Sequence, residues 1–116
     1  LLVKGHHSYI NLELGAEPEW WPEYRLDLGT PLQTAIGGIS ELADGSIYRR
    51  EFANGLVLVN PDAAAVTVTL DHTYRRVEPI GGGFVPEDGS ELGELHYTSV
   101  SAVTLEPYSA AVLLAP

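Results

Sequence analysis

The stretch "IYRREFANGLVLVNP", residues 47–61, carries the pattern that decides the fold. Two runs rich in β-branched, aromatic and other apolar residues, 47–52 and 56–60, lie on either side of Asn54-Gly55. Such runs are typical of β-strands, and Asn-Gly is the strongest short hairpin signal because both residues tolerate positive φ. Pro61-Asp62 then favours a turn, since proline fixes φ and aspartate can bond to the backbone ahead. The stretch predicts an antiparallel hairpin.

Similar runs continue to the C-terminus. In "AVTVTL" (65–70), alternation directs Val66, Val68 and Leu70 inward and the two threonines outward. "LVLV" and "AAVLL" do not alternate, which suits strands that are covered on both faces. The further predicted strands cover residues 65–70, 73–80, 95–106 and 109–115. We therefore predict a mainly β fold, an antiparallel β-sandwich of about six to eight strands.

The first 45 residues follow a different pattern. "SYINLEL" (8–14) predicts one strand with no evident hairpin partner, and glycine breaks the stretch 32–45 too often for a helix. We expect residues 1–45 to form an irregular linking segment packed onto a β-sandwich domain of residues 46–116. The acidic, glycine-rich stretch 81–94 predicts a long mobile loop.

Composition restricts the function. The chain has 116 residues and a net charge of −10, with six basic and 16 acidic residues. Nucleic acids and anionic membranes are disfavoured as partners because they require clustered Lys and Arg. The chain has no cysteine and no apolar run near the roughly 20 residues that cross a bilayer. No motif calls for a cofactor, and no motif indicates a compartment. A start at Leu1 without any methionine favours part of a larger protein.

Two motifs carry a resemblance to a known family. "YRREFANGLVLVNP" and "VTLEPYSAAVLLAP" resemble the C-terminal β-sandwich of glycoside hydrolases that have a (β/α)8 barrel, as in the alpha-amylase superfamily. "HHSYINLEL" and the loop with Trp21, Pro22, Glu23 and Tyr24 resemble a late strand at the end of such a barrel and its link to the sandwich. A complete barrel needs about 250 residues.

The resemblance implies an accessory domain. It implies a non-catalytic β-sandwich that stabilises the catalytic barrel of the same protein and contacts glycan as a secondary role. It assigns no catalytic residue to this chain, and we expect the isolated chain to have no hydrolase activity.

The segment "EWWPEYRLDLGTP" (19–31) contains the candidate site residues. Aromatic faces stack on sugar rings, so Trp20, Trp21 and Tyr24, with Glu23 beside them, are candidate carbohydrate-binding residues. Adjacent tryptophans in an extended chain point to opposite sides, which favours one of them as an anchor for the segment. We predict no metal site, because adjacent His6 and His7 diverge and no partner has a suitable spacing.

Two alternative functions remain. A stand-alone carbohydrate-binding module would present the aromatic rings of this segment coplanar and open to solvent. A structural or oligomerisation sandwich would form a homo-oligomer through an edge strand.

Overall fold

The computed structural model describes residues 2, 17–34, 37–90 and 92–116. The predicted strand 8–14 and the pair His6-His7 lie outside these residues. Within them the fold is mainly β, as predicted, with two short 3-10 helices and no α-helix. None of the described helices is long and apolar enough to cross a membrane.

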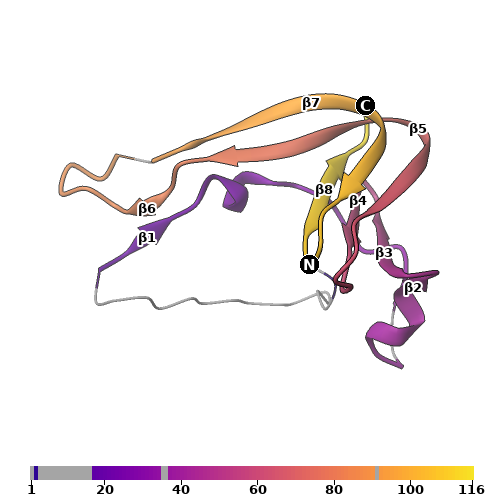
Figure 1. The fold of residues 1–116 in the computed structure, drawn as a ribbon. Coiled ribbons are helices and arrows are strands. Elements are labelled where there is room, and N and C mark those ends of the chain that lie inside the picture. Colours follow the sequence, from indigo (N-terminus) through magenta and orange to yellow (C-terminus); the bar gives the residue numbers. More distant parts are fainter. Residues whose placement is uncertain (1, 3–16, 35–36, 91) are drawn as a thin grey trace.

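The described strands form two antiparallel sheets. A two-stranded sheet pairs β1 with β6, and a six-stranded sheet has the order β2-β3-β4-β8-β5-β7. Figure 1 shows β5 and β7 leaving the other strands as a long ribbon, with β1 and β6 near its far end. The elements are β1 (Glu19–Trp20), η1 (Pro22–Arg25), η2 (Ile39–Leu42), β2 (Ala43–Asp44), β3 (Ile47–Phe52), β4 (Gly55–Val59), β5 (Val66–Ile80), β6 (Gly83–Phe84), β7 (Glu94–Leu105) and β8 (Ala110–Leu114).

The predicted hairpin forms between β3 and β4, with Phe52 opposite Gly55. Its conformation differs from the Asn-Gly expectation, because neither Asn54 nor Gly55 adopts positive φ. Gly55 is the first residue of β4 and meets a packing requirement instead. A Cβ at this position would overlap the Leu113 carbonyl and lie 2.7 Å from Leu28 Cδ2.

The two strands predicted at 65–70 and 73–80 are one continuous strand, β5. The residues between them, Asp71 and His72, are polar but include no glycine or proline, so the backbone stays extended. The pairing register with β7 shifts between Thr69 and Tyr74. Residues 74–80 of β5 and 94–100 of β7 form the projecting ribbon, which we call the arm (Figure 1).

The main core lies on one face of β3, β4 and β8. Residues 66–70 of β5 and 102–105 of β7 pack over this face, which gives the sandwich-like arrangement. As predicted, Leu70 is buried and Val66 and Val68 are partly buried, whereas Thr67 and Thr69 are exposed. The buried cluster consists of Ile47, Leu56, Leu58, Leu70, Tyr74, Val103, Leu105, Ala111 and Leu113.

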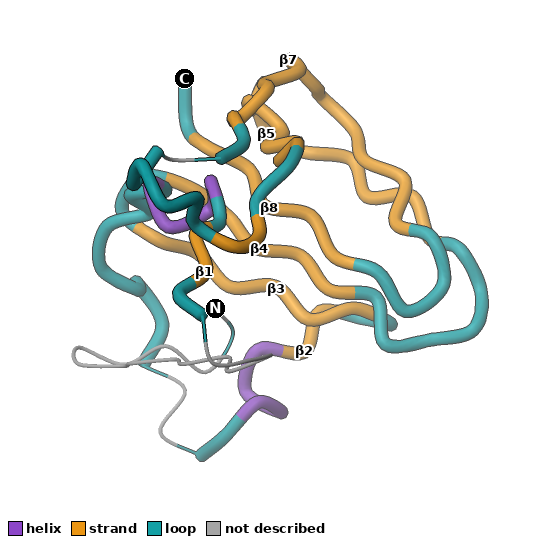
Figure 2. The backbone as a smooth tube through the Cα atoms, turned by 90° about the vertical axis from the view of Figure 1, so that its left-hand side faces the viewer, coloured by secondary structure: helices purple, strands orange, loops and turns teal. Residues whose placement is uncertain are grey.

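The opposite face of the same strands has a second, smaller core. Phe52 and Val57 pack there with Leu28, which comes from the segment before the sheet. Figure 2 shows β3, β4 and β8 side by side in the middle of the sheet. Strand β4 is therefore covered on both faces, as its non-alternating apolar sequence predicts.

Asn60 fixes the end of β4. Its side chain is 1% exposed, and its Nδ2 donates to the carbonyls of Ala64 at 2.8 Å, Glu106 at 3.0 Å and Leu105 at 3.3 Å. Its Oδ1 accepts from the Asp62 amide at 3.0 Å. One amide side chain thus links the turn after β4 to the end of β7.

Asn60→Ala is expected to destabilise the fold by about 2–3 kcal/mol, because it leaves buried carbonyls without donors. The matched control is Asn54→Ala. The Asn54 side chain makes an exposed contact of 3.4 Å to the Asp27 carbonyl, so a change within about 0.5 kcal/mol is expected. Urea unfolding followed by tryptophan fluorescence measures both. Equal effects would contradict the role given to Asn60.

Candidate functional site

Residues 71–74 of β5, which we call the bend, lie where the register with β7 shifts and border a cleft of about 200 Å³. Polar side chains from two strands meet apolar ones at this cleft. Asp71, His72 and Tyr74 come from β5, and Glu51 and Phe52 come from β3. The cleft brings acidic, imidazole, phenol and apolar groups together, and we take it as the candidate site.

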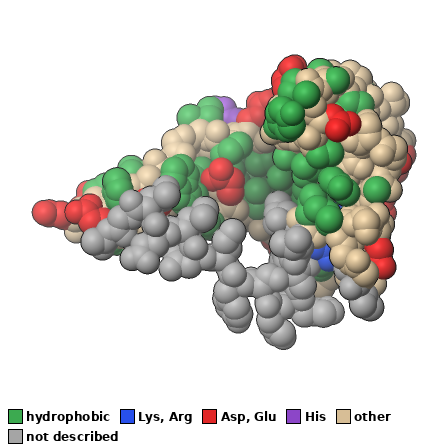
Figure 3. Space-filling view, turned by 60° about the horizontal axis from the view of Figure 1, so that its bottom comes forward, with side chains coloured by type: hydrophobic (Ala, Val, Ile, Leu, Met, Phe, Trp, Pro, Cys, Tyr) green, Lys and Arg blue, Asp and Glu red, His purple; other side chains and the backbone are tan. Residues whose placement is uncertain are grey.

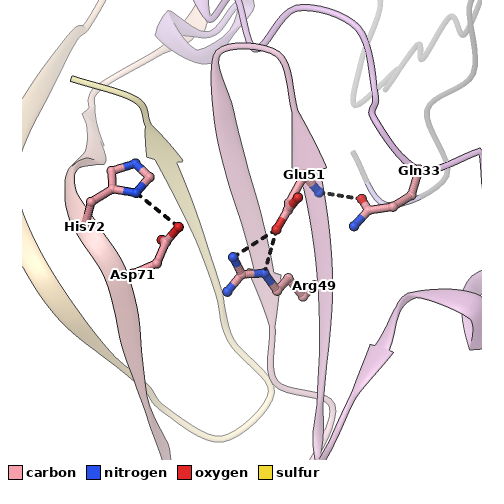
Figure 4. Close-up of polar contacts among 5 residues, drawn as sticks. All are labelled: Gln33, Arg49, Glu51, Asp71 and His72. Carbon is pink, nitrogen blue, oxygen red and sulfur yellow. Dashed lines mark hydrogen bonds and ion pairs between the residues drawn. The ribbon is translucent and has the colours of Figure 1, made fainter.

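Three side chains of the bend contact one another. The Nδ1 of His72 lies 3.1 Å from Oδ2 of Asp71, and the His72 ring stacks on Tyr74 with centroids 4.1 Å apart and planes 26° apart. Asp71 and His72 are largely exposed, at 63% and 47% of the side chain, whereas Tyr74 is buried. Figure 4 shows the Asp71–His72 pair beside the Arg49–Glu51 pair of β3.

The contacts within the bend shift two pKa values. Partial desolvation alone would raise the pKa of Asp71, but its backbone hydrogen bond, the His72 charge and side-chain hydrogen bonds with His72 and Tyr74 together lower it. The pKa of Tyr74 is raised above 10.0 by desolvation, by the Asp71 charge and by the hydrogen bond to Asp71. Both directions favour an ionised Asp71 beside a neutral Tyr74 at neutral pH.

Glu51 is held by two neighbours. Its Oε1 accepts from Arg49 Nε at 3.2 Å and Nη2 at 3.0 Å, a fork of charge-assisted hydrogen bonds. Its backbone amide donates to Gln33 Oε1 at 2.7 Å (Figure 4). The carboxylate is thus oriented by β3 itself, and the backbone by the segment before the sheet.

The cleft has few groups that could perform hydrolysis. Glycoside hydrolysis requires one carboxyl group with a raised pKa as general acid, whereas the pKa of Asp71 is lowered. The residues lining the cleft include no serine, threonine or cysteine beside His72 to act as a nucleophile. Among the described residues, no three His, Asp or Glu side chains are placed to hold a metal ion.

The four residues predicted to bind carbohydrate lie elsewhere, on β1, on η1 and at Trp21 between them, beneath the arm (Figure 1). The Trp20 and Tyr24 rings contact edge to face, with centroids 5.5 Å apart and planes at 90°. Trp21 is half-buried, donates to Glu19 Oε2 at 3.3 Å, and covers Gly82. Glu23 is exposed.

The geometry of these aromatic residues bears on sugar stacking. A pair of rings at 90° presents one face and one edge, not a flat two-ring platform. Tyr24 is 53% exposed and is the most open of the three rings. Carbohydrate binding by Trp20, Trp21, Glu23 and Tyr24 stays a prediction.

The sequence analysis gives no role to His72 and therefore does not find the cleft. His72 instead contacts both Asp71 and Tyr74. The available signal was "DHTY" (71–74), a polar interruption without glycine or proline between two strand-like runs. The sequence around Glu51 does not indicate that this residue lies beside the bend, since that position depends on how β5 packs over β3.

Comparisons with known proteins add no relative. No family model, no curated protein sequence and no solved structure matches this chain.

Tyr74→Phe is expected to raise the pKa of Asp71, because it removes a hydrogen bond that lowers it. A carboxyl group whose pKa is lowered in the folded protein stabilises the fold at pH values above its ordinary pKa of 3.8. This stabilisation is lost as the pH falls through the lowered pKa of the folded state. The variant should therefore lose this contribution at a higher pH. A carbon-13 NMR titration of Asp71 measures the shift, with Tyr108→Phe as control. Identical Asp71 titrations in all three proteins would contradict the contact.

Proposed function

We propose that this chain is the non-catalytic accessory β-sandwich of a glycoside-hydrolase-like protein. In this role it packs against the catalytic (β/α)8 barrel and stabilises it, with glycan contact as a secondary role. The observation that carries the proposal is the set of exposed apolar side chains on the arm, on η1 and on β6.

Four large apolar residues of this region are open to solvent. Tyr24 is 53% exposed, Ile80 52%, Phe84 51% and Tyr97 45%. Figure 3 shows hydrophobic side chains along the projecting part of the molecule. A single exposed apolar side chain needs no explanation, but several on and around one projecting ribbon favour contact with another protein. Ile80 and Tyr97 lie on opposite faces of the arm, since Ile80 pairs with Glu94 and Val77 pairs with Tyr97. We name Tyr24, Ile80, Phe84 and Tyr97 the arm patch.

The motifs behind the resemblance also support the proposal. "YRREFANGLVLVNP" spans β3 and β4, and "VTLEPYSAAVLLAP" spans the end of β7 and β8. These motifs lie side by side, since β4 pairs with β8 from Gly55–Leu114 to Val59–Ala110. The resemblance therefore concerns the core of the sandwich and not scattered surface positions.

The chemistry of the β5 cleft favours a non-catalytic role. Its two carboxylates, Glu51 and Asp71, are engaged by Arg49 and by His72. The pKa of Asp71 is shifted in the direction opposite to that of a general acid. We assign Glu51 and Asp71 a structural role, in which they cover the polar side of the main core.

The test uses the coding sequence upstream of the Leu1 codon, which we expect to encode a (β/α)8 barrel. This barrel, expressed as a separate polypeptide, should bind the 116-residue chain saturably in isothermal titration calorimetry. Phe84→Ser should weaken binding by about tenfold or more, because a buried phenylalanine contributes roughly 1.5–3 kcal/mol.

Tyr108→Ser is the matched control. Tyr108 is 73% exposed but lies outside the arm patch, in the turn between β7 and β8, so its substitution should leave the affinity unchanged. An upstream frame that encodes no barrel would overturn the proposal. Equal weakening by both substitutions would overturn the role of the arm patch.

A further inference from the structure

We propose that β7 pairs with β7 of a second copy of this chain, antiparallel about a two-fold axis, and so joins two six-stranded sheets into one. The inference concerns the edge of β7 and does not depend on the proposed function, although Tyr97 of the arm patch lies on the same strand.

One end of the six-stranded sheet is closed. Strand β2 pairs with the start of β3, and the chain at 30–33 follows the rest of its outer edge. The Leu32 amide donates to the Glu51 carbonyl at 2.9 Å, and the Ala53 amide donates to the Thr30 carbonyl at 2.9 Å. These bonds occupy backbone groups that a foreign strand would need.

The other end of the sheet, β7, has no partner strand among the described residues. Strand β7 pairs on one side with β5 from Val66–Leu105 to Ile80–Glu94, and no described strand pairs with its other side. In an antiparallel pair, alternate residues direct their N–H and C=O groups away from the partner. An edge twelve residues long therefore presents a row of backbone donors and acceptors.

The sequence of β7 lacks the charged and proline residues that often protect an open edge, although its pairing with β5 is irregular between Thr69 and Tyr74. Natural edge strands carry lysine, proline or inward-pointing charges, or are very short. Residues 95–105, "LHYTSVSAVTL", contain no Lys, Arg, Asp, Glu, Pro or Gly. In a chain that is 19% charged, this uncharged edge is compatible with pairing.

A second copy is the partner that fits this edge best. A two-fold axis perpendicular to β7 brings no like charges opposite each other within residues 95–105, and the surface is the same on both chains. Residues 95–105 contain no acidic side chain, so they offer no negative charge that would attract a basic segment of another protein. Because the β2–β3 end is closed, pairing at β7 stops at two copies and does not extend into a filament.

The net charge sets the salt dependence. Each copy carries −10, so the two chains repel one another outside the contact. Added salt screens this repulsion and leaves the backbone hydrogen bonds nearly unaffected. The dimer dissociation constant should therefore fall as the salt concentration rises.

Sedimentation velocity of the 116-residue chain over a concentration series tests the proposal, and a monomer–dimer equilibrium is expected. Ser99→Glu places a charge at an exposed position on β7 and should weaken the dimer at least tenfold. Ser46→Glu makes the same change at an exposed position in the turn between β2 and β3 and should leave it unchanged. Circular dichroism checks that both variants keep the β fold.

Cross-linking provides a second readout. The chain has no cysteine, so Ser99→Cys and Ser46→Cys each introduce a single thiol. A short bis-maleimide should link Ser99→Cys into covalent dimers and leave Ser46→Cys monomeric.

Several outcomes would overturn the proposal. These are a monomer at every concentration and salt, a dimer that Ser99→Glu leaves intact, association that weakens with added salt, and cross-linking through position 46 in preference to 99. A chain that stays monomeric but binds a strand of another protein at β7 would also overturn it.

Discussion

Strands β4 and β8 carry apolar side chains on both faces, and this constraint determines the rest of the structure. Leu56, Leu58 and Leu113 point to one face, and Val57 and Val112 point to the other. An antiparallel sheet with one solvated face would expose half of these side chains. The two faces therefore need two separate covers.

The chain supplies these covers from opposite ends of its sequence. The bent ribbon of β5 and β7 covers one face and contributes Leu70, Val103 and Leu105 to the main core. Leu28, from the segment before the sheet, covers part of the other face. Gly55 fits this arrangement, since any side chain there would crowd Leu28 and the backbone of β8. The same segment continues along the outer edge of β3. It therefore covers the second core and also occupies the backbone groups at that edge.

Much of the sandwich could be predicted from the sequence. Alternation in 65–70 and continuous apolar runs in β4 and β8 are local signals of which faces are buried, and these local signals agree with the final packing. The unbroken β5 could not be predicted in this way, because polar Asp71 and His72 resemble a turn and lie where the pairing register with β7 shifts. The backbone conformation of the hairpin at Asn54 could not be predicted from local sequence either, because it depends on the tight packing at Gly55.

The candidate sites show the same division. Aromatic residues in "EWWPEYRLDLGTP" signal a contact segment, and the structure places η1 against β5 and β7 of the arm. Their edge-to-face arrangement depends on the 3-10 turn at Pro22, which composition does not indicate. The Asp71–His72–Tyr74 cluster is contiguous in sequence, yet Glu51 joins it only because β5 folds over β3. Residue types can be identified early, whereas their relative placement depends on long-range packing.

The central claim is that β4 and β8 require a cover on both faces, and native-state hydrogen exchange tests it most directly. The comparison is between Leu28→Ala, which removes a side chain 2% exposed, and Leu32→Ala, which removes one 61% exposed in the same segment. The account predicts faster exchange of the β4 and β8 amides in Leu28→Ala, by a free energy of about 2–5 kcal/mol, and unchanged exchange in Leu32→Ala. Equal protection of these amides in the two variants would contradict it.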